Sequence, residues 1–343
     1  MVSFYDLLVA TPTVEVQIAL AIFHTFLWYF LINEVLVPIG CHVIARFESK
    51  KRFIHFNRQS FKKMIKWDIG DDEEEQIMAI SRVDAAMIMH LVGGILFIPS
   101  AFGLGSMLPA GMATAMASHA GLCEMGWEVQ DLLYRGYEII WGGEKGRKLN
   151  PRSLMLTLIA HHSASCSAVI PMNIGYTNYQ AWHEGFCIVQ LGSFILLFLQ
   201  QYGYTLDVET KEGLNKMKLA ISISFFTCLW TRIIRYSMIL FIMATDFYAD
   251  KAWVFLCVGV VPSVLLSIFN ILVMKDAWQK FSKFVSMDIK TSFRTAKQHS
   301  KRNIQETIKK IGSIKNLAPK SSSIESHIRS RKLYTGVSAK HVL

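Results

Sequence analysis

Long apolar runs separated by shorter polar stretches dominate the pattern of this chain. Each run approaches the ~20 residues that an α-helix needs to cross the hydrocarbon core of a bilayer. The pattern therefore predicts an all-α, polytopic membrane helix bundle with about seven transmembrane helices. The expected spans are residues 16–39, 83–103, 110–134, 153–175, 184–204, 219–244 and 252–274.

The distribution of Lys and Arg tests this number independently. Basic residues are dense after the first, third, fifth and seventh expected spans, and nearly absent from the other connections and from the first 15 residues. Because cytosolic loops carry the excess of Lys and Arg, the alternation predicts a lumenal N-terminus and a cytosolic C-terminus. No basic stretch precedes the first apolar run, so we expect that run to be retained as a span rather than cleaved as a signal peptide.

The same pattern divides the chain into four segments. Residues 1–45 hold the N-terminal segment and first span, and residues 83–278 hold the remaining transmembrane domain. Residues 46–82 form a charged cytosolic loop that is basic and then acidic, which is typical of a solvated linker. Residues 279–343 form a basic tail that we expect to be largely disordered.

Composition changes the picture of the partners. The chain is 52% hydrophobic and 18% charged, and its formal net charge is +10. A strongly basic chain raises nucleic acid as a partner, but no nucleic-acid-binding motif is present. The basic residues flank apolar runs, where they meet anionic lipid headgroups. We therefore expect membrane lipids and no nucleic acid as partners, and a homodimer stays open.

Ionisable side chains inside three spans carry the chemical information. Glu124, Glu128 and Asp131 follow one another at spacings of four and three, which places them on one face of a helix. Charged groups in a span normally face the protein interior or a cavity, so this face is expected to look inward. Arg232 and Arg235 lie in a later span, and we expect Glu124 and Arg232 to form an ion pair near the middle of the membrane.

The pair His161-His162 lies between those two spans. A neutral imidazole oriented by a carboxylate such as Asp131 acts as a general base near neutral pH. Adjacent residues of a helix point ~100° apart, so the two rings cannot serve one site equally. The pair lacks the i, i+4 spacing of a helical zinc site, and no metal is expected. We assign no role to the isolated residues His24, His42, His90 and His119.

Three stretches of the chain resemble the TLC-domain family of membrane proteins, which includes the ceramide synthases. The stretch 126–133 (Gly-Trp-Glu-Val-Gln-Asp-Leu-Leu) resembles the Gly-aromatic-x-x-x-Asp-leucine stretch of the family, and 160–162 (Ala-His-His) resembles its His-His pair. Residues 231–235 and 265–278 resemble its last two helices. The family's His-Asp-x-Ser-Asp segment is missing, because the corresponding stretch 188–193 contains Gln190 and no Asp.

The resemblance implies a six-helix bundle around a lipid-sized cavity, with an additional N-terminal helix and residence in the endoplasmic reticulum or a related endomembrane. We expect a lipid or an acyl chain to bind in the bundle, where the protein would modify it or regulate lipid composition. As an enzyme it would be an acyltransferase with acyl-CoA as co-substrate and no resident cofactor. His161, His162 and Asp131 would be catalytic, and Glu124, Glu128, Arg232 and Arg235 would bind substrate.

Two other functions stay open at this level. The first is a non-catalytic lipid sensor or cargo receptor, in which the polar network would specify helix packing. The second is a seven-span signalling receptor. The expected topology fits such a receptor, but the third span ends in Leu-Leu-Tyr-Arg without an Asp-Arg-Tyr sequence, and the seventh lacks Asn-Pro-x-x-Tyr.

Overall fold

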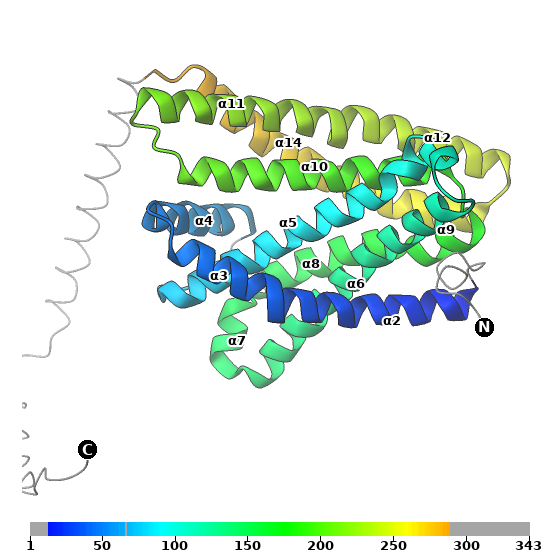
Figure 1. The fold of residues 1–343 in the computed structure, drawn as a ribbon, viewed down its shortest axis with the longest axis horizontal. Coiled ribbons are helices and arrows are strands. Elements are labelled where there is room, and N and C mark those ends of the chain that lie inside the picture. Colours follow the sequence, from blue (N-terminus) through cyan, green and yellow to red (C-terminus); the bar gives the residue numbers. More distant parts are fainter. Residues whose placement is uncertain (1–12, 66, 289–343) are drawn as a thin grey trace, which may run out of the picture. The chain divides into compact units, whose positions relative to one another are not determined.

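The computed structural model describes residues 13–65 and 67–288, which form a bundle of helices without strands (Figure 1). The expectation of an all-α membrane protein is confirmed for this part of the chain. The basic tail expected from residue 279 lies almost entirely outside the described residues, which end at residue 288.

Six stretches of the described residues are long and apolar enough to cross a membrane. All six overlap spans that the apolar pattern predicts. They are Val14–Ala45, Glu73–Ala101, Arg152–Gly175, Gln180–Thr205, Lys211–Ala249 and Trp253–Val285.

Several of these stretches contain more than one helical element. The elements are α2 (Val14–Phe30), η1 (Leu31–Leu36), α3 (Val37–Ala45), α4 (Lys50–Ile65), α5 (Glu73–Ala101), η2 (Leu104–Met107), α6 (Met112–Trp141), α7 (Gly143–Leu149), α8 (Arg152–Cys166), α9 (Val169–Gly175), α10 (Gln180–Thr205), α11 (Lys211–Cys228), η3 (Leu229–Ile234), α12 (Arg235–Ala249), α13 (Trp253–Phe255), η4 (Leu256–Val260) and α14 (Val261–Val285).

The expected third span, residues 110–134, differs from the other six. It folds into α6, which is 30 residues long but is not among the candidate spans. Its apolar stretches are interrupted by Glu124, Glu128 and Asp131, so its hydropathy is lower. The structure thus supports six candidate spans rather than seven. These carboxylates are nevertheless buried, because α6 packs against α2, α5 and α8.

The helices form a ring in which each member contacts the next. Going round the ring, α5 packs on α6, α6 on α8, α8 on α14, α14 on η3, and η3 with α12 on α10, which returns to α5. The first candidate span lies outside this ring, with α2 against α6 and α3 against α5 (Figure 1). Side chains from helices far apart in the sequence therefore meet in the interior of the ring.

Glycines allow two of these helix crossings to be close. A Cβ on Gly126 of α6 would lie 2.6 Å from the backbone carbonyl carbon of His24 on α2. A Cβ on Gly93 of α5 would lie 1.8 Å from Oε1 of Gln190 on α10. Small residues at such crossings are typical of membrane helix packing, where close backbone approach supplies dispersion energy.

The charged loop expected at residues 46–82 is not a simple solvated linker. Its residues 50–65 form α4, which buries Phe53, Ile54 and Phe61 against Trp67. Asn57 on the same helix exchanges two hydrogen bonds with Gln201 of α10, at 2.9 and 3.1 Å. The segment is thus an amphipathic helix anchored to the bundle.

The acidic run at the end of this loop begins α5. Asp72 is the N-cap, and its carboxylate accepts a 2.9 Å hydrogen bond from the backbone N–H of Glu75. Glu73 and Glu74 lie in the first turn. Such a cap satisfies a free N–H, and negative charge at a helix N-terminus stabilises the helix by ~0.3–1 kcal/mol. The run has a local structural role.

Candidate functional site

The ring lines a cavity of about 290 Å³. Ligand pockets begin at roughly this size, at ~300 Å³. Every helix of the ring contributes to its lining. Its apolar wall includes Phe186, Leu196, Leu240, Met243 and Leu266, from α10, α12 and α14. The arrangement is suited to an apolar chain rather than to a polar solute.

Seven of the polar side chains that line this cavity form a group that we call the cavity cluster. They come from α5, α6, α8, α10, η3 and α14. Polar groups at membrane depth are expensive to bury, so their convergence on one cavity makes it the candidate functional site. The members are His90, Glu124, His161, Gln190, Ser193, Arg232 and Asn270.

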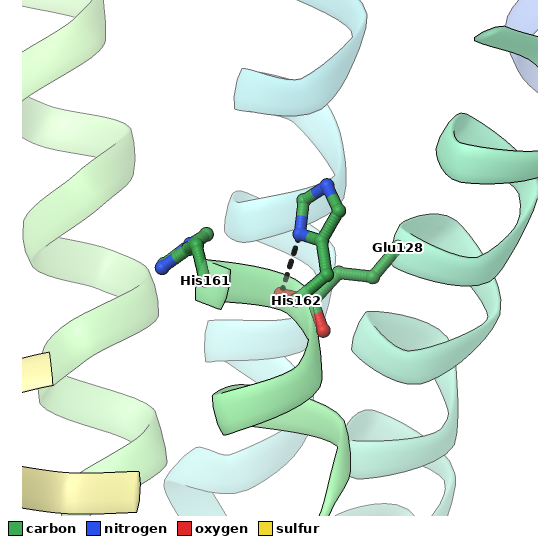
Figure 2. A group of neighbouring side chains, drawn as sticks. All are labelled: Glu128, His161 and His162. Atoms are coloured by element: carbon green, nitrogen blue, oxygen red, sulfur yellow. Dashed lines mark ion pairs between the residues drawn. The ribbon is translucent and has the colours of Figure 1, made fainter. Parts of the chain in front are cut away.

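The two adjacent histidines of α8 point in different directions (Figure 2). His161 lines the cavity, and its ring lies 5.2 Å from that of Phe269, measured between ring centres. His162 is 1% exposed and faces Glu128 of α6, at 3.2 Å from Nδ1 to Oε1. The divergence follows from the ~100° between neighbouring residues of a helix. Only His161 can therefore meet a molecule bound in the cavity.

A second group of charges fills the contact between α6 and α8, and we call it the α6–α8 cluster. It comprises Glu128, Asp131, Arg135, Asn150 and His162, all buried. Asp131 accepts hydrogen bonds of 3.0 and 2.9 Å from Nε of Arg135, and its Oδ2 lies 3.5 Å from Nε2 of His162. Arg135 also donates to Oδ1 of Asn150 at 3.0 Å.

Glu128 completes the α6–α8 cluster. It accepts hydrogen bonds from the hydroxyl of Ser165 and, at 2.9 Å, from the thiol of Cys166. None of the five members of the cluster lines the cavity. Opposite charges and hydrogen bonds thus balance each other within the protein, which is the condition for burying charge at a tolerable free energy.

The structure does not form the expected ion pair between Glu124 and Arg232. Glu124 instead accepts a 3.1 Å hydrogen bond from Nε2 of Gln190 and lies 3.6 Å from Nδ1 of His90. Arg232 donates to Oδ1 of Asn270 at 3.3 Å and to the hydroxyl of Ser193. Both side chains line the cavity, but each contacts other residues instead of its expected partner.

Arg235 lies apart from Arg232. It forms an ion pair with Glu184 of α10, with its Nε and Nη2 at 2.5 and 2.7 Å from the two carboxylate oxygens, and it does not line the cavity. The regular spacing of three residues predicted one shared face. However, Arg232 lies in the π-helical turn η3, whose wider winding changes the angle between successive side chains.

Four members of the cavity cluster were not predicted as site residues. These are His90, Gln190, Ser193 and Asn270. Gln190 and Asn270 are 1% and 2% exposed, so their amides are desolvated and need partners. Their positions inside apolar spans could have revealed them, because amides are as unusual there as charges.

Several polar atoms of the cavity cluster are buried without a hydrogen-bond partner among the described residues. Each belongs to a side chain that lines the cavity. A buried donor or acceptor left unpaired costs about 1–3 kcal/mol, so such a concentration points to a ligand that supplies the missing bonds. The atoms are Nδ1 of His90, Nδ1 of His161, Oε1 of Gln190, Nε of Arg232 and Nδ2 of Asn270.

Glu128, His161 and His162 form a group whose ligand atoms lie within 4.8 Å of one another. The two imidazoles point apart (Figure 2), and the oxygens of Glu128 already accept two hydrogen bonds. The absence of a metal stays a prediction.

Comparisons with family models, with curated proteins and with solved structures give no match to this chain. The likeness to TLC-domain proteins therefore depends on the motifs in stretches 126–133 and 160–162 and in the last two spans.

Proposed function

We propose that this membrane protein binds the apolar chain of a lipid in the cavity of its helix ring and modifies or regulates that lipid, as a TLC-like protein would. The observation that carries the proposal is the cavity itself, which has one apolar wall and one group of polar side chains with unpaired atoms. An amphiphile has the matching distribution of apolar and polar surface.

The same proposal takes α6 as a seventh transmembrane helix, with the N-terminus in the lumen of the endoplasmic reticulum and the C-terminus in the cytosol. The alternation of basic and non-basic connections supports it, since omitting α6 would place two basic loops on opposite sides. The burial of Glu124, Glu128 and Asp131 supports it too, because α6 then exposes few charges to lipid.

If the lipid is modified, proton transfer falls to His161. Its unpaired Nδ1 and its position in the cavity favour it over His162, which Glu128 and Asp131 enclose. A neutral His161 would take the proton of a lipid hydroxyl or amine as that group attacks the thioester carbonyl of acyl-CoA. The thiolate that leaves would receive a proton, and Asp131 would act only through His162.

A non-catalytic sensor or cargo receptor is the second candidate. The observation that favours it is that, among the described residues, no carboxylate contacts His161. The ring of His161 is bordered by Phe269 and His162. A general base is normally oriented by a hydrogen bond to its second nitrogen. Without one, the ring can still bind the polar part of a ligand.

Lipid extraction from the purified chain tests binding. We expect the wild-type protein to retain an amphiphile that mass spectrometry identifies, and Leu240→Trp to lose it because the indole fills the apolar part of the cavity. Phe241→Trp is the matched control, since Phe241 follows Leu240 in the chain but is 70% exposed and does not line the cavity. Equal retention by both variants would contradict the proposal.

The same extraction separates the two candidates. His161→Ala should retain the unmodified lipid and lack its product if His161 transfers protons. His42→Ala, an exposed histidine on α3, is the control and should behave like the wild type. If His161→Ala changes only the affinity, and lipid composition in cells expressing it is unaltered, the protein is a sensor or receptor.

A further inference from the structure

The guanidinium of Arg232 is hydrogen-bonded only to neutral groups among the described residues. Its donors contact the hydroxyl of Ser193, the backbone carbonyl of Val189 at 3.3 Å and Oδ1 of Asn270 at 3.3 Å. No ion pair of Arg232 is formed within the described residues, whereas Arg135 and Arg235 each contact a carboxylate. A cation inside a membrane protein without a counter-ion is strongly unfavourable.

Arg232 and its partner Asn270 each keep an unpaired donor. Nε of Arg232 is buried without a partner, and so is Nδ2 of Asn270. Asn270 is 2% exposed, and its Oδ1 is occupied by Arg232, which fixes the orientation of the amide and leaves its N–H groups for another acceptor. Both side chains line the cavity. A positive charge and two unpaired donors that line one cavity call for an anion.

The surroundings limit what the anion can be attached to. Arg232 and Asn270 come from η3 and α14, and the lining of the cavity beyond them on α12 and α14 is mostly apolar, with Ile239, Leu240 and Leu266. The hydroxyl of Tyr236, the next lining residue after Arg232, is occupied by the backbone carbonyl of Ser263. A carboxylate carries one charge and two oxygens, which matches one guanidinium and one amide. A phosphate carries more charge and more acceptor oxygens than these two donors satisfy.

We propose that the ligand of this cavity is a single-chain lipid with a carboxylate, as in a long-chain fatty acid. One carboxylate oxygen accepts from Nε of Arg232 and the other from Nδ2 of Asn270, and the alkyl chain lies along the apolar wall. The inference rests on the proposed lipid binding and deepens it by naming the charge of the headgroup. Glu124, which lines the same cavity, stays paired with Gln190 and His90.

Competition with a fluorescent fatty acid tests the inference. The full chain is reconstituted in nanodiscs of zwitterionic lipid with cis-parinaric acid bound, and oleate or oleyl alcohol is added. The two competitors share a chain and differ in the charge of the head. We expect oleate to displace the fluorescent acid and oleyl alcohol to bind at least about tenfold more weakly, since a hydrogen bond to a charged group is worth ~1.5–3 kcal/mol.

Two variants locate the contact. Arg232→Gln should weaken the binding of oleate by about tenfold or more and change the affinity for oleyl alcohol by less than about twofold. Asn270→Asp should weaken the binding of oleate at least as much. The carboxylate of the new Asp side chain would occupy the position of the oleate carboxylate and repel it. This second variant gives Arg232 a counter-ion, so its thermal stability should not fall, and loss of oleate binding cannot then be attributed to unfolding.

The control removes an arginine of the same helix that lies outside the cavity. The double variant Arg235→Gln with Glu184→Gln neutralises both members of their ion pair and should bind oleate like the wild type. Equal affinity of the wild type for oleate and oleyl alcohol would overturn the inference and leave lipid binding standing. Unchanged oleate binding by Asn270→Asp would also overturn it. Failure of both competitors and of cis-parinaric acid to bind would overturn lipid binding as well.

Discussion

The cavity cluster and the α6–α8 cluster are built from the same kinds of side chain and differ in how those side chains are satisfied. Each holds a histidine of α8, a glutamate of α6 and an arginine. In the α6–α8 cluster Glu128 and Arg135 are hydrogen-bonded, and the ring nitrogens of His162, which make no hydrogen bond within the described part of the chain, lie 3.2 and 3.5 Å from carboxylate oxygens of Glu128 and Asp131. In the cavity cluster, four side chains keep a buried polar atom that has neither a hydrogen bond nor an ion pair among the described residues, namely His161, Gln190, Arg232 and Asn270.

The difference shows that buried charge alone does not identify a site. Both clusters are equally conspicuous in the sequence, since both place ionisable residues inside apolar helices. Buried charges that face opposite charges inside the protein have little left to offer a ligand, and such pairing is what stable packing requires. Incomplete pairing beside an open volume leaves atoms that a ligand can satisfy. The comparison assigns stability mainly to one cluster and binding to the other.

The largest effect should come from breaking the α6–α8 cluster. Asp131→Ala leaves Arg135 and His162 without the carboxylate that both contact. Removing one partner of a buried pair costs about 3–5 kcal/mol, and we expect the midpoint of thermal unfolding in detergent to fall steeply. Glu124→Gln in the cavity cluster should cost far less. Similar losses in the two variants would remove the distinction between the clusters.

A smaller effect is expected where α5 crosses α10. Gly93→Ala introduces a methyl group at 1.8 Å from Oε1 of Gln190, so the Gln190 side chain must turn and release Glu124. We expect oleate affinity to change and stability to fall by about 1–2 kcal/mol, as for other overpacked sites.

Gly136→Ala on α6 is the matched control for this glycine. A Cβ there meets nothing within 4 Å, so alanine should raise stability by about 0.5–1 kcal/mol through its better helix propensity. Calorimetric unfolding of the two variants gives opposite signs if the crossing is as close as described. Equal signs would show that Gln190 adapts without leaving Glu124.

The smallest effect concerns charges outside the membrane, where α4 meets the following loop. Burial acts to raise the pKa of Asp68, but Lys62 and Arg58 outweigh it and hold that pKa below the usual 3.8. A lowered pKa means that this carboxylate stabilises the fold above pH ~4 and that its contribution is lost as the pH falls through the folded pKa. The side chain is 40% exposed, so the contribution should not exceed about 1 kcal/mol.

Hydrogen exchange of the α4 amides measures this contribution. Exchange should quicken, after correction for the intrinsic pH dependence, between pH 5 and pH 3 in the wild type. In Asp68→Asn the corrected rate should be the same at both pH values and close to that of the wild type at pH 3. A wild-type rate independent of pH would mean that the ion pairs of Asp68 with Arg58 and Lys62 contribute nothing.

Periodicity predicted the features of the site that depend on regular helices. The shared face of Glu124, Glu128 and Asp131 and the divergence of His161 from His162 both follow from ~100° per residue. The contact of His162 with Asp131 also follows, because both lie at similar depth in neighbouring helices. What periodicity could not supply is which of these groups borders empty space, since that depends on the size of every side chain around the ring.

Two differences have specific physical causes. The separation of Arg232 from Arg235 arises from the π-helical turn, which the local amino-acid composition does not predict. The charged loop at residues 46–82 has many Lys and Arg, and this charge favoured the prediction of a solvated linker over that of a helix. Its residues Phe53, Asn57 and Phe61 recur every four positions, and all three are buried. That spacing is typical of one face of a helix and could have predicted α4, but the prediction gave more weight to the net charge.

The π-helical turn η3 also bears on how this protein can change. A wide turn holds one residue more than a regular helix would need to cover the same length, so a single deletion within Leu229–Ile234 would restore ordinary winding. The rest of α12 would then keep its orientation, whereas the same deletion in a regular helix would rotate everything beyond it by about 100°. The length of this short segment, more than the identity of any residue in it, decides which arginine faces the interior.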